Sequence, residues 1–236
     1  MDVSARFLPN PQARITVRPM GREGHALVII DDAFENPETL VELACRTPFA
    51  APQLTQYPGL NAPLPEDYSQ GLIHALRPML QSAFGIPSHL PLSFFGFFAL
   101  ATQSPEDLKP IQKVPHQDST DPFKIATVHY LCRGEQGGTG FYRHQATGFE
   151  SVDASQRALY VESVSSELAQ RGGQLTRHAG RDTPGYEMID FAEAAFNRLI
   201  VYRSHCLHSG LLEQSTLTDD PATGRLTANS FLEVAR

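Results

Sequence analysis

The stretch PHQDSTDPFKIATVHYLC, residues 115–132, joins a polar turn to an apolar run that predicts a β-strand. The run from Lys124 to Cys132 is rich in β-branched and aromatic residues, which favours a strand over a helix. In the turn, His116 and Asp118 stand two residues apart, so their side chains can point to one face of extended chain. Pro115 and the polar loop after Asp118 indicate a strand end, where side chains can project into a cavity. Considered alone, the triplet also fits a surface histidine beside an aspartate that caps a turn.

Strand-like runs dominate the chain from Leu92 onward. The run Leu92 to Leu100 contains four phenylalanines, a density that predicts a strand buried on both faces. Further strands are expected at Gly140 to His144, Tyr186 to Phe191, Arg198 to Tyr202 and Leu226 to Val234. The long segment Gly148 to Gly185 interrupts them, and inserted segments of this kind often form lids or substrate walls. It contains an expected helix, Asp153 to Arg171, whose apolar face is formed by Leu159, Val164 and Leu168.

The first part of the chain has a more helical pattern. Ala26 to Ile30 predicts a buried strand, and Asn36 is the expected N-cap of a short helix that follows. The proline-rich stretch Pro48 to Pro65 predicts irregular structure. A second helix is expected from Glu66 to Phe84, with a kink or an early end at Pro78.

Helices first and strands later, without a clear linker, indicate one α+β domain over residues 1–236. Residues 1–89 are expected to support a core formed by residues 90–236, which contains the insertion 148–185.

Composition excludes several classes of function. The 236 residues carry a net charge of −7 and no basic stripe, which argues against a nucleic-acid partner. Three widely separated cysteines, Cys45, Cys132 and Cys206, predict neither disulfides nor a thiolate zinc site. No segment is long and apolar enough for a signal peptide or a membrane span, so a cytoplasmic, membrane-free protein is expected. The oligomeric state stays open, with a homodimer among the alternatives.

A second histidine for a metal site is available at His208. It follows the apolar strand Arg198 to Tyr202 and a short polar break, as expected for a ligand carried on a later strand. His205 competes for the role, but the two histidines cannot share one face of a regular strand. His208 is favoured because His205 falls in the break. Two histidines and one carboxylate on one face leave open positions on a metal ion, as in non-haem Fe(II) oxygenases.

Arg225 is a candidate anion-binding residue at the start of the final strand. The turn-like residues before it predict a hairpin that lays this strand beside the one that carries His208. An arginine buried at this place needs an anionic partner, since an unpaired buried charge is costly. The alternative is an exposed arginine that flanks a hairpin.

Together these residues resemble a known family. The order His116-x-Asp118, His208, Arg225 resembles the Fe(II)/2-oxoglutarate-dependent oxygenases, in particular their prolyl-hydroxylase-like branch. Two further segments resemble the Tyr-Leu strand and the Gly-Gly strand start of that branch: Val128-His129-Tyr130-Leu131 and Gly137-Gly138-Thr139-Gly140-Phe141. In the first half, the Asp31-Asp32 strand end and the Tyr57-Pro58-Gly59 loop resemble poorly characterised bacterial oxygenase-like proteins.

The resemblance implies a double-stranded β-helix, or jelly roll, from about Leu90 onward, with N-terminal helices packed on one sheet. It implies that the metal ligands and catalytic residues are His116, Asp118 and His208. It also implies that Arg225 binds the distal carboxylate of 2-oxoglutarate, with Tyr130 and Thr227 as further contacts. The gap of 17 positions between His208 and Arg225 is longer than in many relatives. The cofactor and co-substrates would be Fe(II), 2-oxoglutarate and O₂, with ascorbate as a reductant.

Two alternatives use the same residues. Zinc hydrolysis can employ two histidines and a carboxylate, but it needs a separate base and gives Arg225 no role. A non-catalytic jelly-roll protein could keep the pocket for a metal or small molecule.

The substrate is expected to be a small molecule. If the cations of two segments converge on the cavity mouth, they favour an anionic or amino-acid-like substrate. These cations are Arg143, His144, Arg177, His178 and Arg181. The alternative is that they are separate loop charges with no common direction.

Overall fold

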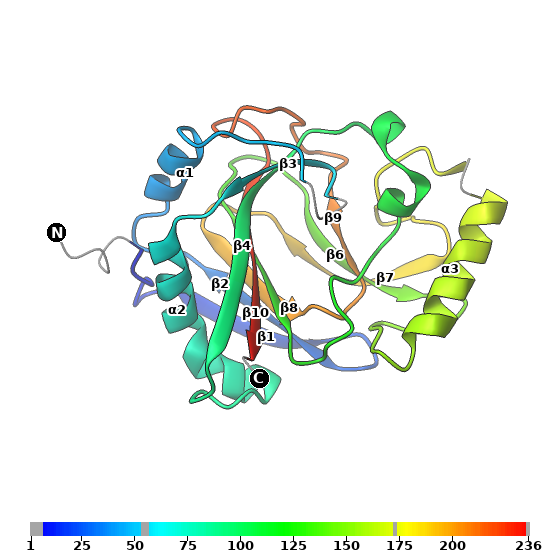
Figure 1. Cartoon of the computed structure of the whole chain (residues 1–236), viewed down its shortest axis with the longest axis horizontal. Coiled ribbons are helices and arrows are strands. Elements are labelled where there is room, and N and C mark those ends of the chain that lie inside the picture. Colours follow the sequence, from blue (N-terminus) through cyan, green and yellow to red (C-terminus); the bar gives the residue numbers. More distant parts are fainter. Residues whose placement is uncertain (1–6, 53–56, 172–173, 235–236) are drawn as a thin grey trace.

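The computed structural model describes residues 7–52, 57–171 and 174–234. Within these ranges the strands form two antiparallel sheets (Figure 1). The large sheet has the strand order β1-β2-β8-β5-β10-β4-β3, and the small sheet has the order β7-β6-β9. The strands are β1 (Arg14–Met20), β2 (His25–Asp31), β3 (Gly59–Pro63), β4 (Leu92–Ala101), β5 (Ile125–Tyr130), β6 (Gly138–His144), β7 (Tyr186–Glu193), β8 (Arg198–Arg203), β9 (His208–Leu211) and β10 (Leu226–Val234). The helices are α1 (Glu38–Ala44), α2 (Glu66–Phe84) and α3 (Arg157–Arg171), and two short 3-10 helices span Pro105–Asp107 and Pro110–Lys113.

Helix α2 covers the outer face of the large sheet. Its buried residues Leu72, Leu76 and Leu80 pack into a core with side chains of the sheet such as Phe98 and Leu232. Burying one such leucine contributes about 1.5–3 kcal/mol, so this face anchors the helix. The helix ends where Gly85 adopts a left-handed φ of +64°, the usual glycine cap.

The inner face of the large sheet packs against the small sheet. This second core joins Leu27 of β2, Ile200 of β8 and Tyr130 of β5 to Phe141 of β6 and Ala192 of β7. The small sheet therefore covers the half of the large sheet formed by β2, β8 and β5. The inner face of β4 and β10 extends beyond this cover, because Phe95 there is 58% exposed.

Charged contacts close the covered side of the two sheets. The Arg18 guanidinium of β1 donates to both carboxylate oxygens of Asp190 on β7, at 2.7 and 3.2 Å. The buried Glu150 carboxylate accepts the backbone N–H groups of Arg22 and Glu23 in the β1–β2 turn and also pairs with Arg143 of β6. These contacts fix the N-terminal hairpin to the small sheet.

Helix α3 packs on the other face of the small sheet. Its buried residues Tyr160 and Val164 join Tyr142 of β6 and Tyr186 of β7 in a third core. Figure 1 shows α1 and α2 on one flank of the molecule and α3 on the opposite flank. The helix expected inside the insertion 148–185 is present, and no described residue of α3 lines the cavity described below. Its expected apolar face is wrong in part, since Leu159 is 56% exposed and Tyr160 takes the inward position.

The mainly β architecture predicted for the second half is confirmed, and the facing antiparallel sheets are jelly-roll-like. Helix α2 has the predicted limits, and Pro78 does not end it early. Within the part of the chain that the structure describes, no helix is both long and apolar enough to cross a membrane.

Several local expectations are corrected. The proline-rich stretch 48–65 is not wholly irregular, because β3 pairs with β4. Helix α1 has Pro37, not Asn36, at its N-cap, without a side-chain cap bond. Strand β4 is buried on both faces only from Phe98 onward. Strand β10 lies between β4 and β5 in the large sheet and not beside the His208 strand, which pairs with β6 in the small one.

Candidate metal centre

Backbone hydrogen bonds bring three distant positions together at the start of β9. The His116 N–H donates to the His208 carbonyl at 2.9 Å, and the His208 N–H donates to the His116 carbonyl at 2.8 Å. The Asp118 N–H donates to the Ser204 carbonyl at 2.9 Å in the turn after β8. This short bridge fixes the His-x-Asp turn onto the chain that leads into β9, so sequence-distant side chains meet at one place.

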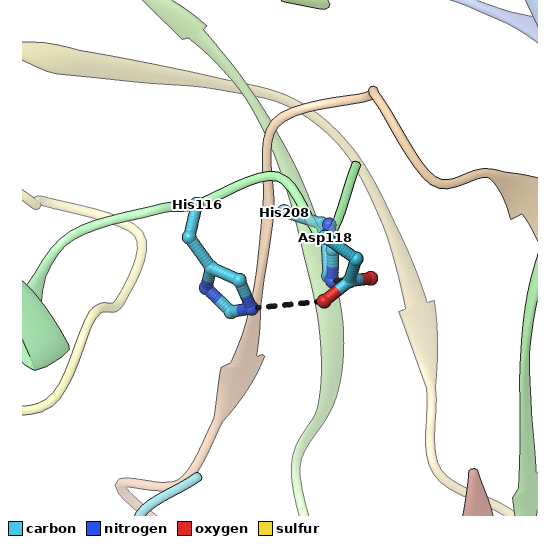
Figure 2. Close-up of side chains that lie close together, drawn as sticks. All are labelled: His116, Asp118 and His208. Carbon is cyan, nitrogen blue, oxygen red and sulfur yellow. Dashed lines mark ion pairs between the residues drawn. The ribbon is translucent and has the colours of Figure 1, made fainter. Parts of the chain in front are cut away.

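The side chains of His116, Asp118 and His208 converge (Figure 2). One potential ligand atom from each lies within 4.8 Å of the other two. Asp118 Oδ1 is 3.7 Å from His116 Nε2, and Asp118 Oδ2 is 3.3 Å from His208 Nε2. Neighbouring ligands that each lie about 2.1 Å from one ion are separated by about 3 Å, so these spacings fit a shared divalent metal.

A hydrogen bond fixes the tautomer of His208. Its Nδ1–H donates to the Cys206 carbonyl at 3.0 Å, which leaves the lone pair on Nε2, the nitrogen that faces Asp118. The Tyr202 ring packs against the His208 ring at a centroid distance of 4.9 Å, nearly edge to face. Both contacts hold the imidazole in the orientation that a ligand needs.

His116 is neutral at physiological pH. Its side chain is 54% exposed because it lines a cavity, but protein surrounds that cavity. The resulting loss of hydration and the neighbouring His208 lower the pKa of His116 to about 4. An unprotonated imidazole is the form that binds metals.

The three residues lie in a cavity of about 480 Å³ that also contains Arg225. Its polar lining is Gln112, His116, Gln117, Asp118, Thr127, Thr139, His178, His208, Ser209, Arg225 and Asn229. Apolar and aromatic side chains form the rest, among them Tyr57, Phe97, Ile111, Tyr202, Leu212 and Phe231. A concave space of this size, lined by both apolar and polar side chains, is typical of a small-molecule site.

Arg225 is buried, with 4% of its surface exposed. Its Nε–H and Nη2–H groups donate to the carbonyls of Gln136 and Gly138 at 3.1 and 2.9 Å. Among the described residues, no carboxylate lies within ion-pair distance of Arg225. A buried cation that contacts two carbonyls and the Tyr57 hydroxyl, lines a cavity and has no carboxylate partner among the described residues can bind an anion there.

The two other residues expected near Arg225 take different positions. Thr227 lies on β10 beside the Tyr57 hydroxyl, whose pKa is raised by burial while Arg225 opposes the rise. Tyr130 is fully buried beneath Arg225, with the guanidinium 5.7 Å from its ring centre. The Tyr130 hydroxyl pairs with the Thr139 hydroxyl at 2.6 Å, and Thr139 lines the cavity in its place. Burial raises the pKa of Tyr130 to about 12.

Tyr57 is the residue near Arg225 that the sequence did not single out for a role. The Tyr-Pro-Gly loop is recognisable in the sequence, but no residue near it indicates that the Tyr57 side chain reaches β10. The aromatic residues Phe97 and Phe231 were likewise expected only as strand residues.

His205 lies outside the metal-ligand group. It is 3% exposed, and its ring packs edge to face on His25 at 4.9 Å. Burial lowers the pKa of His205 to about 4. The choice of His208 over His205 on grounds of strand geometry thus agrees with their positions.

The cations proposed for the cavity mouth do not converge. Arg143 pairs with Glu150 and Glu187, and His144 pairs with Glu167 at 3.2 Å. Arg181 lies over the Phe191 ring on the outer side of β7, and Arg177 lines a separate depression. Of the five, His178 alone lines the 480 Å³ cavity. The condition under which these cations would favour an anionic or amino-acid-like substrate is therefore not met, and the alternative of separate charges holds.

Residues 11–232 match the model of DUF6445, a family of unknown function. No curated protein matches the sequence. HygX from Streptomyces hygroscopicus, in a crystal structure with nickel and 2-oxoglutarate bound, is 12% identical with a TM-score of 0.52; the match covers 88% of this chain and 82% of HygX. A Pseudomonas putida prolyl-4-hydroxylase is 15% identical with a TM-score of 0.42, over 90% of this chain and 88% of its own. The non-haem α-ketoglutarate-dependent epimerase SnoN from nogalamycin biosynthesis is 12% identical with a TM-score of 0.48, over 89% of this chain and 78% of its own. At these identities the similarity to HygX shows the fold alone.

Proposed function

This chain belongs to DUF6445, a family of unknown function, and we propose that it is an Fe(II)- and 2-oxoglutarate-dependent oxygenase that hydroxylates a small molecule. The proposal is drawn from the residues of its own site. One observation carries the proposal. Two histidines and an aspartate within 4.8 Å share a cavity with a buried arginine that has no carboxylate partner among the described residues. The fold shared with HygX supports the proposal, and the facing sheets would be the double-stranded β-helix of these oxygenases.

The donor set fits Fe(II). Two imidazoles and one carboxylate bind one face of a divalent ion and leave adjacent positions for other ligands. When bound there, Fe(II) together with 2-oxoglutarate and O₂ supplies the oxidising power for hydroxylation of a C–H bond. His116, Asp118 and His208 would hold the ion, and the Cys206 carbonyl would keep His208 in the ligating tautomer.

Arg225 would orient 2-oxoglutarate by its distal carboxylate. The guanidinium is held in place by two carbonyls, so little conformational freedom is lost when a carboxylate binds. The Tyr57 hydroxyl lies beside Arg225, lines the cavity and would donate to the same carboxylate, and Thr227 would support the Tyr57 hydroxyl from behind. Tyr130 would act through Arg225 and Thr139 without contacting the co-substrate.

The reaction balances as 2-oxoglutarate, O₂ and R–H giving succinate, CO₂ and R–OH. One oxygen atom of O₂ enters succinate and the other enters the product. A zinc hydrolase would leave the cavity arginine without a role, and a binding protein would bind the ligands without producing succinate.

The decisive experiment is an anaerobic titration of the Fe(II)-loaded protein with 2-oxoglutarate. We expect a weak visible absorption band that saturates at one equivalent, and slow succinate release once air and ascorbate are added. Asp118→Ala should abolish stoichiometric Fe(II) binding with the fold intact by circular dichroism. His74→Ala, which removes an exposed histidine of α2, is the matched control and should bind Fe(II) normally. Normal iron binding by Asp118→Ala would contradict the metal assignment. Absence of both band and succinate in the wild type would favour the non-catalytic binding protein.

A further inference from the structure

Three phenylalanine rings form a continuous aromatic surface on β4 and β10. The ring centres of Phe95 and Phe97 are 5.7 Å apart, and those of Phe95 and Phe231 are 6.3 Å apart and nearly parallel, at 17°. Phe97 and Phe231 are 6.4 Å apart. Each pair lies within the range at which aromatic rings attract one another.

Strand register places all three rings on the inner face of the large sheet. Phe231 lies directly opposite Phe95, and Phe97 follows Phe95 by two residues, so the three side chains point the same way. The neighbouring positions Phe94 and Leu232 point to the α2 core on the other face. The three rings are therefore not part of that core.

The small sheet covers this surface only in part: Phe95 is 58% exposed, whereas Phe97 and Phe231 are partly buried and Phe231 also packs against the core between the two sheets. Exposed aromatic groups that form a contiguous patch beside a cavity mark ligand-binding sites more often than chance, because leaving them in water is unfavourable. Phe97 and Phe231 themselves line the cavity, so the patch runs from the outside of the molecule into the candidate metal centre. Ile111, which is 43% exposed, adds an apolar side chain to the same lining.

The register also gives the distance to the metal centre. Phe231 pairs with Ala126 on β5, and Ala126 pairs with Tyr202 on β8, whose ring packs on His208. Two strand spacings separate the Cα atoms of Phe231 and Tyr202 by about 10 Å. A molecule that rests on the phenylalanines can therefore present an atom a few bonds away to the ligand group.

The charges near the surface favour a neutral group. Arg143, His144 and Arg181 have partners elsewhere. Lys124 lies over the Phe231 ring at 5.6 Å, but its ammonium is also 3.9 Å from Glu233. The three rings themselves offer an apolar and planar contact.

We propose that Phe95, Phe97 and Phe231 form an aromatic platform that binds a flat apolar part of the substrate, an aromatic ring or a conjugated plane. That the ligand of this platform is the substrate of the enzyme rests on the proposed oxygenase function. The substrate class is a small organic molecule whose reacting C–H group is separated from its planar group by a few bonds.

The test is a set of binding titrations by ligand-observed NMR. Three neutral probes differ only in their side chain: N-acetyl-phenylalaninamide, N-acetyl-leucinamide and N-acetyl-glutaminamide. We expect the wild-type protein to prefer the phenyl probe. Phe95→Leu keeps apolar bulk but removes the ring. It should lower the affinity for the phenyl probe by about 2- to 10-fold, which corresponds to the loss of one aromatic pair interaction. The affinity for the leucine probe should change little.

Ile15→Ala is the matched control, since Ile15 is 55% exposed on β1 at the opposite edge of the sheet. It should leave the binding of all three probes unchanged. A thermal melt of each variant checks that it folds. Equal binding of the three probes, or no effect of Phe95→Leu on the phenyl probe, would overturn the platform.

Succinate release, measured separately without any probe, keeps the two proposals distinct. A protein that selects the phenyl probe through Phe95 but releases no succinate would retain the platform and lose the oxygenase assignment. A protein that releases succinate without selecting the phenyl probe would do the reverse.

Discussion

Arg225 shows how one residue combines two roles that a lysine could not. Its planar guanidinium donates to the carbonyls of Gln136 and Gly138 and still has an N–H group for a carboxylate. Arg225→Lys keeps the charge but loses this geometry. We expect affinity for 2-oxoglutarate to fall by about 10-fold or more, as for the loss of a hydrogen bond between charged groups. Calorimetric titration of the metal-loaded protein measures it. Arg14→Lys, at an exposed ion pair with Asp32, is the control and should not change the affinity. Unchanged affinity in Arg225→Lys would show that another group binds the distal carboxylate of 2-oxoglutarate.

His129 makes the stability of the fold depend on pH. It is fully buried, with Tyr68 Oη 3.2 Å from its Nδ1 and Asn197 Oδ1 3.1 Å from its Nε2. Burial lowers its pKa from 6.5 to about 4. Protons therefore bind the unfolded chain more readily, and stability is lost as the pH falls from about 6.5 through 4, by at most about 3 kcal/mol. His129→Gln should reduce this pH dependence in urea unfolding curves by the share of His129, since His116 and His205, whose pKa values are also lowered to about 4, contribute in the same pH range; His74→Ala should leave it unchanged. An equally steep pH dependence in His129→Gln would assign the effect to other groups.

Helix α3 connects to the metal centre through one hydrogen bond. The Tyr160 hydroxyl donates to the carbonyl of Pro115, immediately before His116, at 3.3 Å, and it lies 3.1 Å from the Tyr186 hydroxyl. Tyr160→Phe removes this support without opening a cavity. A hydrogen bond of this kind contributes about 1 kcal/mol, so we expect metal affinity to fall by about 5-fold. A Co(II) titration followed by visible spectroscopy checks it, with Leu159→Ala as the exposed neighbour that should have no effect. Wild-type affinity in Tyr160→Phe would show that α3 has no influence on the ligand loop.

Elements were predictable where the signal was local. The apolar spacing of Leu72, Leu76 and Leu80 specifies α2 because a helix buries one stripe of its own residues. Strand β1 gave no signal, since most of its side chains are exposed and it is held by backbone pairing with β2. Strand β3 was hidden because the prolines around it predict irregular structure, and its strand form depends on backbone pairing with β4.

In the candidate site, too, the residues that could be predicted are those with a local signal in the sequence. The His-x-Asp pair is visible because its spacing is local, and His208 because a strand precedes it. The partner of β10 was mispredicted because pairing between distant strands leaves no local trace. Tyr57 and the aromatic platform depend on which strands become neighbours in the large sheet, so spacing within any single segment could not reveal them.

At the scale of the whole molecule, Glu150 joins the two sheets. Its carboxylate is 3% exposed and accepts two backbone N–H groups of the β1–β2 turn as well as the Arg143 guanidinium. Glu150→Ala leaves those donors without their acceptor, so we expect the free energy of unfolding to fall by about 3 kcal/mol. Urea unfolding measures it. Glu38→Ala breaks an ion pair with Arg133 whose side chains are both more than 60% exposed, and it should cost less than about 1 kcal/mol. Similar losses of unfolding free energy in the two variants would contradict the role of Glu150 in connecting the two sheets.

The placement of the aromatic platform on paired strands also bears on how such a protein could acquire a new substrate. Side chains of β4 and β10 alternate between the platform and the α2 core, so a change at Phe95 or Phe231 leaves the opposite face untouched. Selectivity could then be altered by single substitutions, without grafting or lengthening a loop. For directed evolution this separates the positions that tolerate variation from those that hold the fold, and it makes a small saturation library at Phe95, Phe97 and Phe231 the economical starting point.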